Sequence, residues 1–405
     1  MGENNKRKLW VVSEVFYPEQ VATGYIMTEI ALALKEQYEV HVICGPEDYE
    51  RSGSQVNYDK VRGLGIHRLN SFNFNKNKLH TRALRLVGIA LGLFFKGLWH
   101  IKKNDKVFIV TNPAPLIPLY SFLKWLKGFS LVVLVHDVFP ENLVTGNMVA
   151  PTNPMYKVLK RMFDKSYRKA ELLVVLGRDM QEVMMGKTGL PAARIPIICN
   201  WADLDQVTPL PFNENELIRK HNLQGKIIIQ YAGNHGRLQH LLQFLEVVAQ
   251  VRNPILHFVF VGNGAVKKQM QGFVALHQLA NVSFWEPFSR PEQNVYLNAC
   301  HIGLVTLSDE LYGLGVPSKT YNIFASSKPV LFIGNKDTEI AKTVLGHDCG
   351  WVFSHNQPAA LTEFLEQLSF ASLEGIAEKG RRARDLVLSS YSKPIILGQF
   401  KNLLS

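Results

Sequence analysis

Residues that suit an anion gather between positions 315 and 331. Here the sequence GVPSKTYNIFASSKPVL predicts a glycine turn, a helix and the start of a buried strand. Ser318 takes the N-cap position after Pro317, so the free amides of the first turn and the positive end of the helix dipole would attract an anion. Lys319 adds a full charge. The segment predicts a diphosphate-binding site on an α/β scaffold, with an ordinary capped helix as the alternative.

Two glycine loops follow buried strands in the same half of the chain. They are Ala232-Gly-Asn-His-Gly236 and Gly262-Asn-Gly264. Arg237 and Gln239 stand where the next helix begins. Because the carboxyl ends of parallel strands meet at one edge of a sheet, we expect the loops, Arg237 and Lys319 to converge. Converging amides and cations would bind a pyrophosphate.

The N-terminal half offers a second set of candidates. A strand over 8–16 is followed by a loop ending at Gly24 and then by a helix, which predicts parallel pairing through a right-handed crossover. Gly24 is a candidate site wall or a plain loop glycine, and the loop lacks the GxGxxG pattern of dinucleotide-cofactor sites. The strand over 131–135 delivers His136 and Asp137 to the same edge of its sheet, where an irregular loop follows.

The whole-chain composition predicts a globular protein of two domains. The chain has 405 residues, of which 47% are hydrophobic, and its net charge of +11 indicates an anionic partner. The four cysteines show no metal spacing, so we expect reduced thiols in a cytosolic protein. We expect no signal peptide and no transmembrane helix, because the longest apolar run, 86–95, is too short for a bilayer.

A linker is predicted over 200–216, after a last strand of the first half at 195–199 and before the strand–loop–helix pattern restarts. It contains a DxD string, Asp203-Leu-Asp205. Such strings hold a metal in some sugar transferases, but this string follows no buried strand directly. We therefore expect no metal there.

The stretch 76–106 is basic and apolar together. On a helical wheel one face collects the basic residues, while leucines, phenylalanines and Trp99 cover much of the rest; that face holds Lys78, Arg82, Arg85, Gly92, Lys96 and Lys103. The pattern over 78–103 favours a helix lying on an anionic membrane surface, and the basic run 156–169 would extend it. A core helix with a basic outer side is the alternative.

Five motifs in order resemble those of family 4 glycosyltransferases of the GT-B fold. They are VxSEVFYPE at the start, HDVFPEN, YAGNHG, FVGNG and VPSK. Within that family the chain is most similar to bacterial surface-polysaccharide transferases, typified by N-acetylfucosaminyl transferases. The resemblance implies an α/β fold of two Rossmann-like parallel-sheet domains facing across a cleft. It implies residues 1–205 plus a returning helix 386–405 on the acceptor side, and 206–385 for the nucleotide-sugar.

The resemblance implies a retaining enzyme that moves a sugar from a nucleotide-sugar donor, a UDP-sugar, to a lipid-linked acceptor without a metal or cofactor. It implies work at the inner face of the cell membrane, as a cytoplasmic, peripheral protein of O-antigen, capsule or colanic acid synthesis. The residues carried over as catalytic are His136, Arg237 and Lys319. Those carried over as donor-binding are Gly24, Asp137, Gly233, Asn234, Glu286, Pro287, Ser318 and Asn322.

The chain departs from the family at two places. The family carries two glutamates eight residues apart, and here Leu314 and Asn322 occupy those positions. Gln239 stands near the lysine expected in the phosphate loop. Asn322 could still bond a ribose hydroxyl, and Lys319 could replace the missing charge.

Three other readings stay open at this stage. The same fold serves nucleotide-sugar 2-epimerases, although these need acidic groups around the sugar. A non-catalytic member could scaffold a membrane assembly complex. Nucleic-acid binding would explain the charge, but the basic groups cluster with leucines and not with stacking aromatics, so we expect no nucleic-acid partner.

Overall fold

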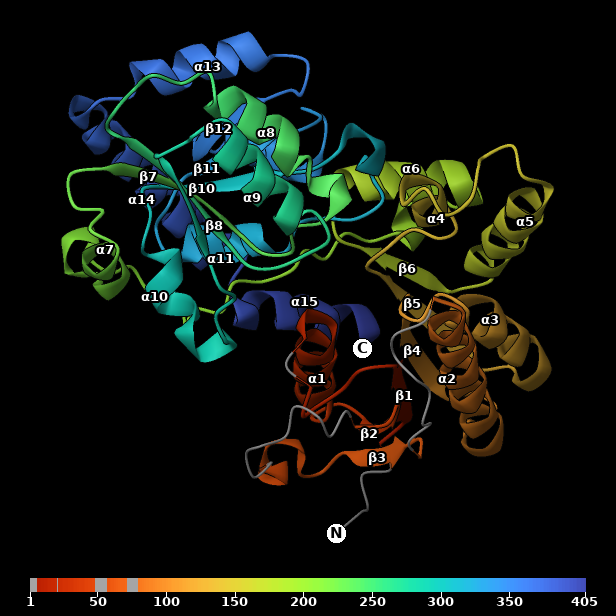
Figure 1. The fold of residues 1–405 in the computed structure, drawn as a ribbon. Coiled ribbons are helices and arrows are strands. Elements are labelled where there is room, and N and C mark those ends of the chain that lie inside the picture. The colour runs from red at the N-terminus through yellow and green to blue at the C-terminus, as the bar shows by residue number, and fades with distance from the viewer. Residues whose placement is uncertain (1–5, 20, 48–56, 71–78) are drawn as a thin grey trace. The chain divides into compact units, whose positions relative to one another are not determined.

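The computed structural model describes residues 6–19, 21–47, 57–70 and 79–405, without the side chains of 79–84. The described chain forms two compact units (Figure 1). Unit 1 contains residues up to 176 together with 180–198 and 397–405, and unit 2 contains 177–179 and 199–396. We predicted that 199–205 and 386–396 belong to the first domain, and they pack with unit 2. The N–H of Ala202, for example, donates to the carbonyl of Tyr391 at 2.9 Å.

Unit 1 is built on a six-stranded parallel sheet in the order β3-β2-β1-β4-β5-β6. The strands are β1 (Lys8–Ser13), β2 (Glu39–Cys44), β3 (Gly65–Arg68), β4 (Lys106–Val110), β5 (Ser130–Val135) and β6 (Leu172–Val175). The helices are α1 (Ala22–Leu34), α2 (Leu79–His100), α3 (Leu116–Lys127), α4 (Glu141–Thr145), α5 (Pro154–Arg168) and α6 (Arg178–Thr188). The central strands are near-continuous apolar runs because helices cover both faces of a parallel sheet.

The strand predicted over 195–199 is absent, and a single parallel bridge joins Val175 to Ile197. Proline at 196 has no N–H to donate to a ladder, although its carbonyl accepts from the N–H of Val175 at 3.0 Å. β3 was not predicted, because Gly-Ile-His-Arg contains a single apolar residue.

Unit 2 repeats the design with the sheet order β12-β11-β10-β7-β8-β9, again all parallel. The strands are β7 (Ile227–Ala232), β8 (Leu256–Val261), β9 (Val282–Trp285), β10 (Ile302–Thr306), β11 (Val330–Ile333) and β12 (Gly350–Phe353). The helices are α7 (Glu216–Lys220), α8 (Leu241–Val248), α9 (Lys267–Leu276), α10 (Gln293–Leu297), α11 (Lys319–Ala325), α12 (Glu339–Gly346), α13 (Pro358–Gln367) and α14 (Leu373–Ser390).

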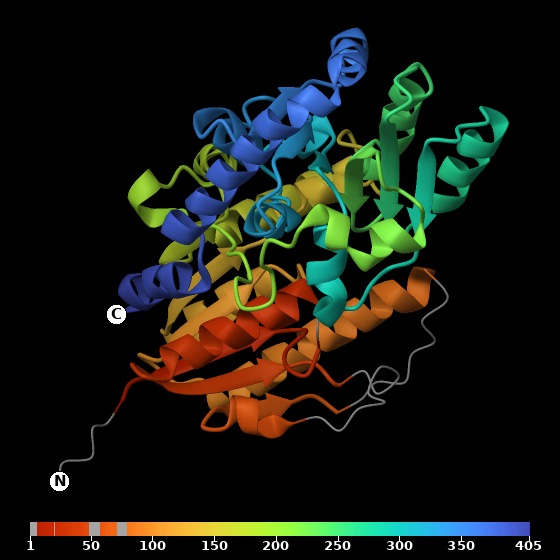
Figure 2. The same cartoon turned by 90° about the vertical axis from the view of Figure 1, so that its left-hand side faces the viewer.

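Both faces of this second sheet are packed. Ile229 and Leu304 belong to a core with α8, α9 and α13, whereas Val305 and Phe332 belong to a core with α11, α12 and α14. The last helix, α15 (Lys393–Leu404), follows α14 toward the C-terminus (Figure 2). Its end is held in unit 1, where the ring of Phe400 meets that of Phe108 edge-on at 6.0 Å between centroids.

Two α/β units with six-stranded parallel sheets are the fold class that the sequence predicted. Each helix in the described residues is either too short or too polar to span a bilayer.

Candidate functional site

The two glycine loops of unit 2 lie against each other at the carboxyl ends of β7 and β8. The N–H of Gly233 donates to the carbonyl of Val261 at 2.9 Å. A Cβ added to Gly262 would stand 2.1 Å from the Gly233 oxygen, and one added to Gly264 would stand 2.5 Å from the His235 oxygen. Both glycines also have positive φ, at 130° and 159°. Side chains at these positions are therefore excluded, because the backbones of the two loops pack directly against each other.

Lys319, at the start of α11, reaches the first of these loops. Its Nζ lies 3.5 Å from the centroid of the Tyr231 ring, and a Cβ added to Gly233 would be 3.5 Å from the same nitrogen. Within the described residues no carboxylate forms an ion pair with Lys319. Burial lowers its pKa to about 7, while the face of the Tyr231 ring favours the charged form. A half-buried cation with no protein counter-ion is suited to an anionic ligand.

His235 is a member of this cluster whose role the sequence did not predict. Its ring is buried, both ring nitrogens lack a hydrogen-bond partner in the described structure, and the Tyr231 ring lies 5.8 Å away. Burial, with the nearby charges of Lys267 and Lys319, lowers the pKa of His235 to about 4, so the ring is neutral at pH 7. The signal in the sequence that could have identified His235 as a site residue is its position between Gly233 and Gly236 of the loop.

Arg237 lies on the same loop in a short 3-10 helix (Arg237–Gln239). Its side chain is exposed, and it forms no ion pair within the described part of the chain. Asn234 is exposed, and its carbonyl accepts from the Tyr231 hydroxyl at 2.7 Å. The Oε1 of Gln239 is buried and has no partner in the described structure. The loop thus carries the Arg237 guanidinium, which has no ion pair among the described residues, four positions after Gly233, the glycine that Lys319 approaches.

Four other predicted donor residues stand apart from these contacts. Ser318 directly precedes α11, has a helical backbone conformation and is exposed. The sequence predicted that its side chain caps the helix, but the side chain forms no capping hydrogen bond. The Oδ1 of Asn322 accepts the N–H of Asp203 at 3.0 Å, which leaves its Nδ2 for a ligand. Glu286 and Pro287 follow β9, and both are exposed. The Oε1 of Glu286 forms an ion pair with the Nζ of Lys267 at 2.9 Å.

In unit 1, His136 and Asp137 lie at the carboxyl end of β5 as predicted. The N–H groups of both residues donate to the hydroxyl of Thr111 at 3.1 Å, which fixes the turn. The Nε2 of His136 is buried without a partner in the described structure, and burial lowers the pKa of His136 to about 4. The ring is therefore a neutral group with an unused nitrogen. Asp137 accepts from the amide of Asn142 at 3.2 Å.

The sequence predicted that Gly24 ends a loop, but the structure places it in the first turn of α1. Its carbonyl accepts from the Thr28 hydroxyl at 2.7 Å, and a Cβ added to it would stand 2.9 Å from the Glu19 oxygen. Glycine is required there by a close backbone approach. The helix begins earlier than its apolar stripe indicated.

Both carboxylates of the DxD string are paired with cations. Asp203 meets Arg290 at 3.0 Å, and Asp205 meets Lys393 at 3.3 Å. Their role in this structure is to hold the start of unit 2 to its neighbours.

Comparison with known proteins places the chain in a family. A model of Glycosyltransferase Family 4 matches residues 24–206. WbjE of Pseudomonas aeruginosa, named as a probable glycosyltransferase, is 31% identical over 396 residues, which is 97% of this chain and 96% of WbjE. The chain belongs to glycosyltransferase family 4.

Two further matches extend this result. WcaI of Escherichia coli (strain K12), which is named as a putative colanic acid biosynthesis glycosyl transferase, is 23% identical over 350 residues. The match covers 83% of this chain and 85% of WcaI. The crystal structure of Anabaena Alr3699/HepE in complex with UDP matches with a TM-score of 0.72 at 12% identity over 98% of this chain and 99% of HepE. At that identity the likeness shows the GT-B fold alone. The glycosyltransferase assignment rests on the sequence relatives.

Proposed function

We propose that this protein is a retaining glycosyltransferase that moves a sugar from a UDP-sugar to a lipid-linked acceptor in bacterial surface-polysaccharide synthesis. The observation that carries the donor assignment is Lys319, whose half-buried ammonium lies against the glycine loop after β7 and has no counter-ion in the described part of the chain. The UDP in the HepE structure, on the same fold, favours uridine as the nucleotide.

In this proposal the donor diphosphate lies along the exposed residues Gly233 and Asn234, with Lys319 and Arg237 as its cations. The anomeric carbon–oxygen bond breaks, and its electron pair passes to the diphosphate. Cations already fixed there stabilise that charge more in the transition state than in the ground state. The acceptor hydroxyl attacks the anomeric carbon from the face that the diphosphate leaves, and its proton passes to a phosphate oxygen. No metal is invoked.

The unit 1 residues keep the roles that the family resemblance implies. His136 would hydrogen-bond the donor sugar through its unused Nε2, and Asp137 would support the turn. In unit 2, Gly233 and Asn234 would approach the phosphates, Glu286 and Pro287 the nucleobase, and Ser318 and Asn322 the diphosphate and ribose. Gly24 would line the donor diphosphate or sugar, where α1 begins close to Glu19.

A thermal-shift panel of UDP-, GDP- and dTDP-sugars tests the donor. A ligand that binds the folded state raises the melting temperature, so we expect UDP-sugars to stabilise the protein more than the others do. Equal shifts for all three nucleotides would count against uridine recognition. Appearance of an epimerised UDP-sugar without acceptor would replace the transferase with an epimerase.

We further propose that the enzyme works as a peripheral protein on the inner face of the cell membrane, through one surface of unit 1. α2, α3 and α5 pack side by side. Their outward side chains include unusually many large apolar groups: Leu86, Val87, Leu91, Phe95, Trp99, Phe122, Trp125, Leu126, Met155, Val158 and Met162. Trp99 and Trp125 are 86% and 71% exposed. Exposed apolar area on this scale marks an interaction site.

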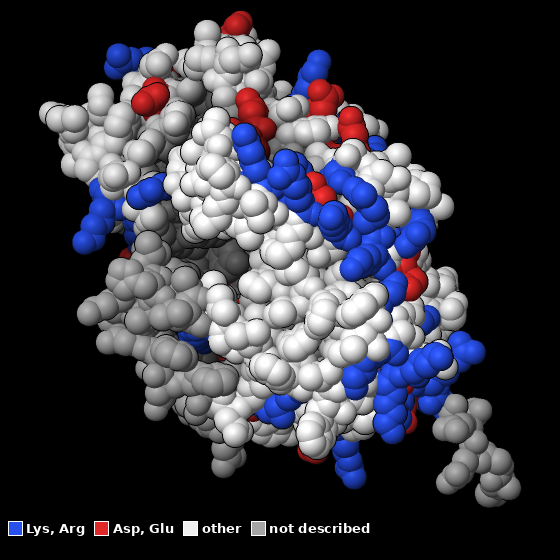
Figure 3. All heavy atoms as spheres, turned by 90° about the vertical axis from the view of Figure 1, so that its right-hand side faces the viewer, with Lys and Arg blue, Asp and Glu red and all other residues white. Residues whose placement is uncertain are grey.

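Basic residues adjoin this apolar surface. Exposed Lys102 and Lys103 follow α2, and α5 presents exposed Lys157, Arg161, Lys165 and Arg168. Figure 3 shows Lys and Arg gathered beside an uncharged stretch on this side of the protein. The outer face of α2 differs from the sequence prediction. Arg85 and Lys96 are half-buried, Lys103 lies beyond the helix, and part of the apolar residues, Phe95 and Trp99 among them, point outward. Lys78 and the Arg82 side chain lie outside the described residues.

Vesicle co-sedimentation tests this surface. We expect binding to vesicles of phosphatidylglycerol and phosphatidylcholine, and loss of most of it in Trp99→Ser/Trp125→Ser, since each buried indole contributes about 2 kcal/mol. Phe370→Ser, at an exposed site in unit 2, is the matched control. Equal sedimentation of the double variant and wild type would refute the surface, and equal binding to neutral vesicles would refute the role of the basic groups.

A further inference from the structure

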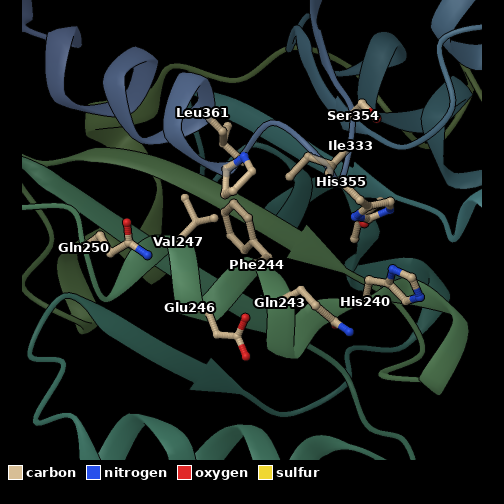
Figure 4. Close-up of a pocket in the computed structure, with 12 residues that line it drawn as sticks. His240, Gln243, Phe244, Glu246, Val247, Gln250, Ile333, Ser354, His355 and Leu361 are labelled. Atoms are coloured by element: carbon tan, nitrogen blue, oxygen red, sulfur yellow. The ribbon is translucent and has the colours of Figure 1, made fainter.

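A cavity of about 230 Å³ opens in unit 2 between α8, the start of α13 and the ends of β10 and β11 (Figure 4). Its floor is apolar and consists of Phe244, Val247, Ile333 and Leu361, all buried in the core of that side of the sheet. In Figure 4 the side chains of Phe244, Val247 and Leu361 point toward one another. None of the residues predicted for the donor site lines this cavity.

Polar groups surround the apolar floor. Gln243 and Glu246 project from α8 and Gln250 follows its end; all three are exposed, so they are open to a ligand. At the opposite end from Gln250, the rings of His240 and His355 meet edge-on at 4.6 Å between centroids (Figure 4). Two amides, a carboxylate and two imidazoles supply both donors and acceptors.

The inner wall contains a polar group without a partner. Thr306, the last residue of β10, lines the cavity and is 2% exposed. Its hydroxyl has no hydrogen-bond partner in the described structure, which is unusual for a buried polar atom. A ligand that brings a hydroxyl into the cavity would satisfy it.

The charges at the cavity select against ions. Among the described residues no lysine or arginine lines it, and Glu246 is the single carboxylate in that lining. Burial and the neighbouring His355 lower the pKa of His240, so this imidazole is neutral at pH 7. An anion would find no counter-charge. The fitting occupant is neutral, with an apolar face for the floor and hydroxyl or amide groups around its edge.

We propose that this cavity is a second carbohydrate site, which binds one pyranose residue apart from the donor site. The C–H face of the ring would lie on Phe244, Val247 and Leu361. Its hydroxyls would pair with Gln243, Glu246 and Gln250 on one side and with the two imidazoles at the end. The residue could belong to a free sugar or to a glycan chain, since both present the same groups.

Saturation-transfer NMR and calorimetry with N-acetylglucosamine and with chitotriose test the proposal. We expect binding to wild type, weakened roughly tenfold or more in Gln243→Ala/Gln250→Ala, because each amide contributes about one hydrogen bond. Thr306→Val, which replaces the hydroxyl with a methyl group of similar size, should weaken it as well. Chitotriose binding as tightly as the monosaccharide identifies a chain unit as the occupant, whereas monosaccharide binding alone identifies a free sugar.

Two control variants keep this test separate from the donor site. Gln367→Ala removes an exposed amide from α13 outside the cavity, and Lys319→Met removes the donor-site cation. Both should bind the sugars as wild type does. Sugar binding that is unchanged in Gln243→Ala/Gln250→Ala, that is lost in Lys319→Met, or that is undetectable for both probes at about 10 mM would overturn the proposal.

Discussion

Replacing Lys319 with methionine should weaken UDP binding and leave the fold intact. Methionine keeps the length of the side chain and its packing on Tyr231 but removes the charge. A hydrogen bond to a charged group contributes about 1.5–3 kcal/mol, and each 1.4 kcal/mol is about tenfold in affinity. We therefore expect the Kd for UDP to rise about 10- to 150-fold, measured by isothermal titration calorimetry. Lys268→Met, at an exposed position of α9, is the matched control.

The same variant makes a signed prediction about pH and stability. The folded-state pKa of Lys319 is about 7, below the ordinary value of 10.5, so protonation opposes folding. The penalty is fully present below pH 7 and is relieved as the pH rises toward 10.5. In the absence of ligand, Lys319→Met should be at least as stable as wild type at pH 6.5, by thermal denaturation. Wild type should gain stability relative to the variant between pH 7 and 10.

UDP binding should show the opposite dependence, because the anion needs the protonated lysine. The affinity of wild type should fall as the pH rises above 7, and the affinity of Lys319→Met should stay nearly flat over the same range. Two results would refute the reasoning: wild-type affinity for UDP in Lys319→Met, or the same pH dependence in both proteins.

Three further predictions follow from the structure. Arg237→Ala should lower turnover and raise the Kd for UDP, with no change in melting temperature, because its side chain is exposed and unpaired among the described residues; unchanged kinetics would remove it from the site. His136→Phe should lower kcat while the protein stays folded, and wild-type activity should show no His136 titration between pH 5.5 and 8, because the pKa of this buried ring is about 4. Asn322→Leu should cost about 1–3 kcal/mol of stability in urea unfolding, because the N–H of Asp203 loses its acceptor; an unchanged midpoint would show that this bond contributes nothing.

Apolar runs in the sequence predicted most strands of the two sheets, and each strand that was predicted wrongly or missed has a cause in its own residues. The strand predicted over 131–135 is β5, which starts one residue earlier, and its five apolar residues are all buried; the strand predicted over 8–16 is β1, which ends at Ser13. Pro196 interrupts an otherwise strand-like run. β3 is an edge strand whose residues are all half-buried, so it lacks the hydrophobic signal.

The site could be predicted in part, because loops can be located from sequence but side-chain neighbours cannot. The glycine loop after β7 and the start of α11 were identified as convergent, and Lys319 does reach that loop. Its contact with Tyr231 joins residues 88 positions apart in the numbering, which no spacing reveals. The outward face of α2 was also not predictable, because a helix with apolar residues on several sides orients by the partners it packs against.

Hydrogen–deuterium exchange with and without UDP tests the central claim most directly. If the nucleoside diphosphate lies between the glycine loop and Lys319, UDP should slow amide exchange in peptides covering 231–240 and 315–322. Peptides from α13, residues 358–367, should not change. Protection confined to other parts of the chain, with 231–240 and 315–322 exchanging as in the free protein, would contradict the account.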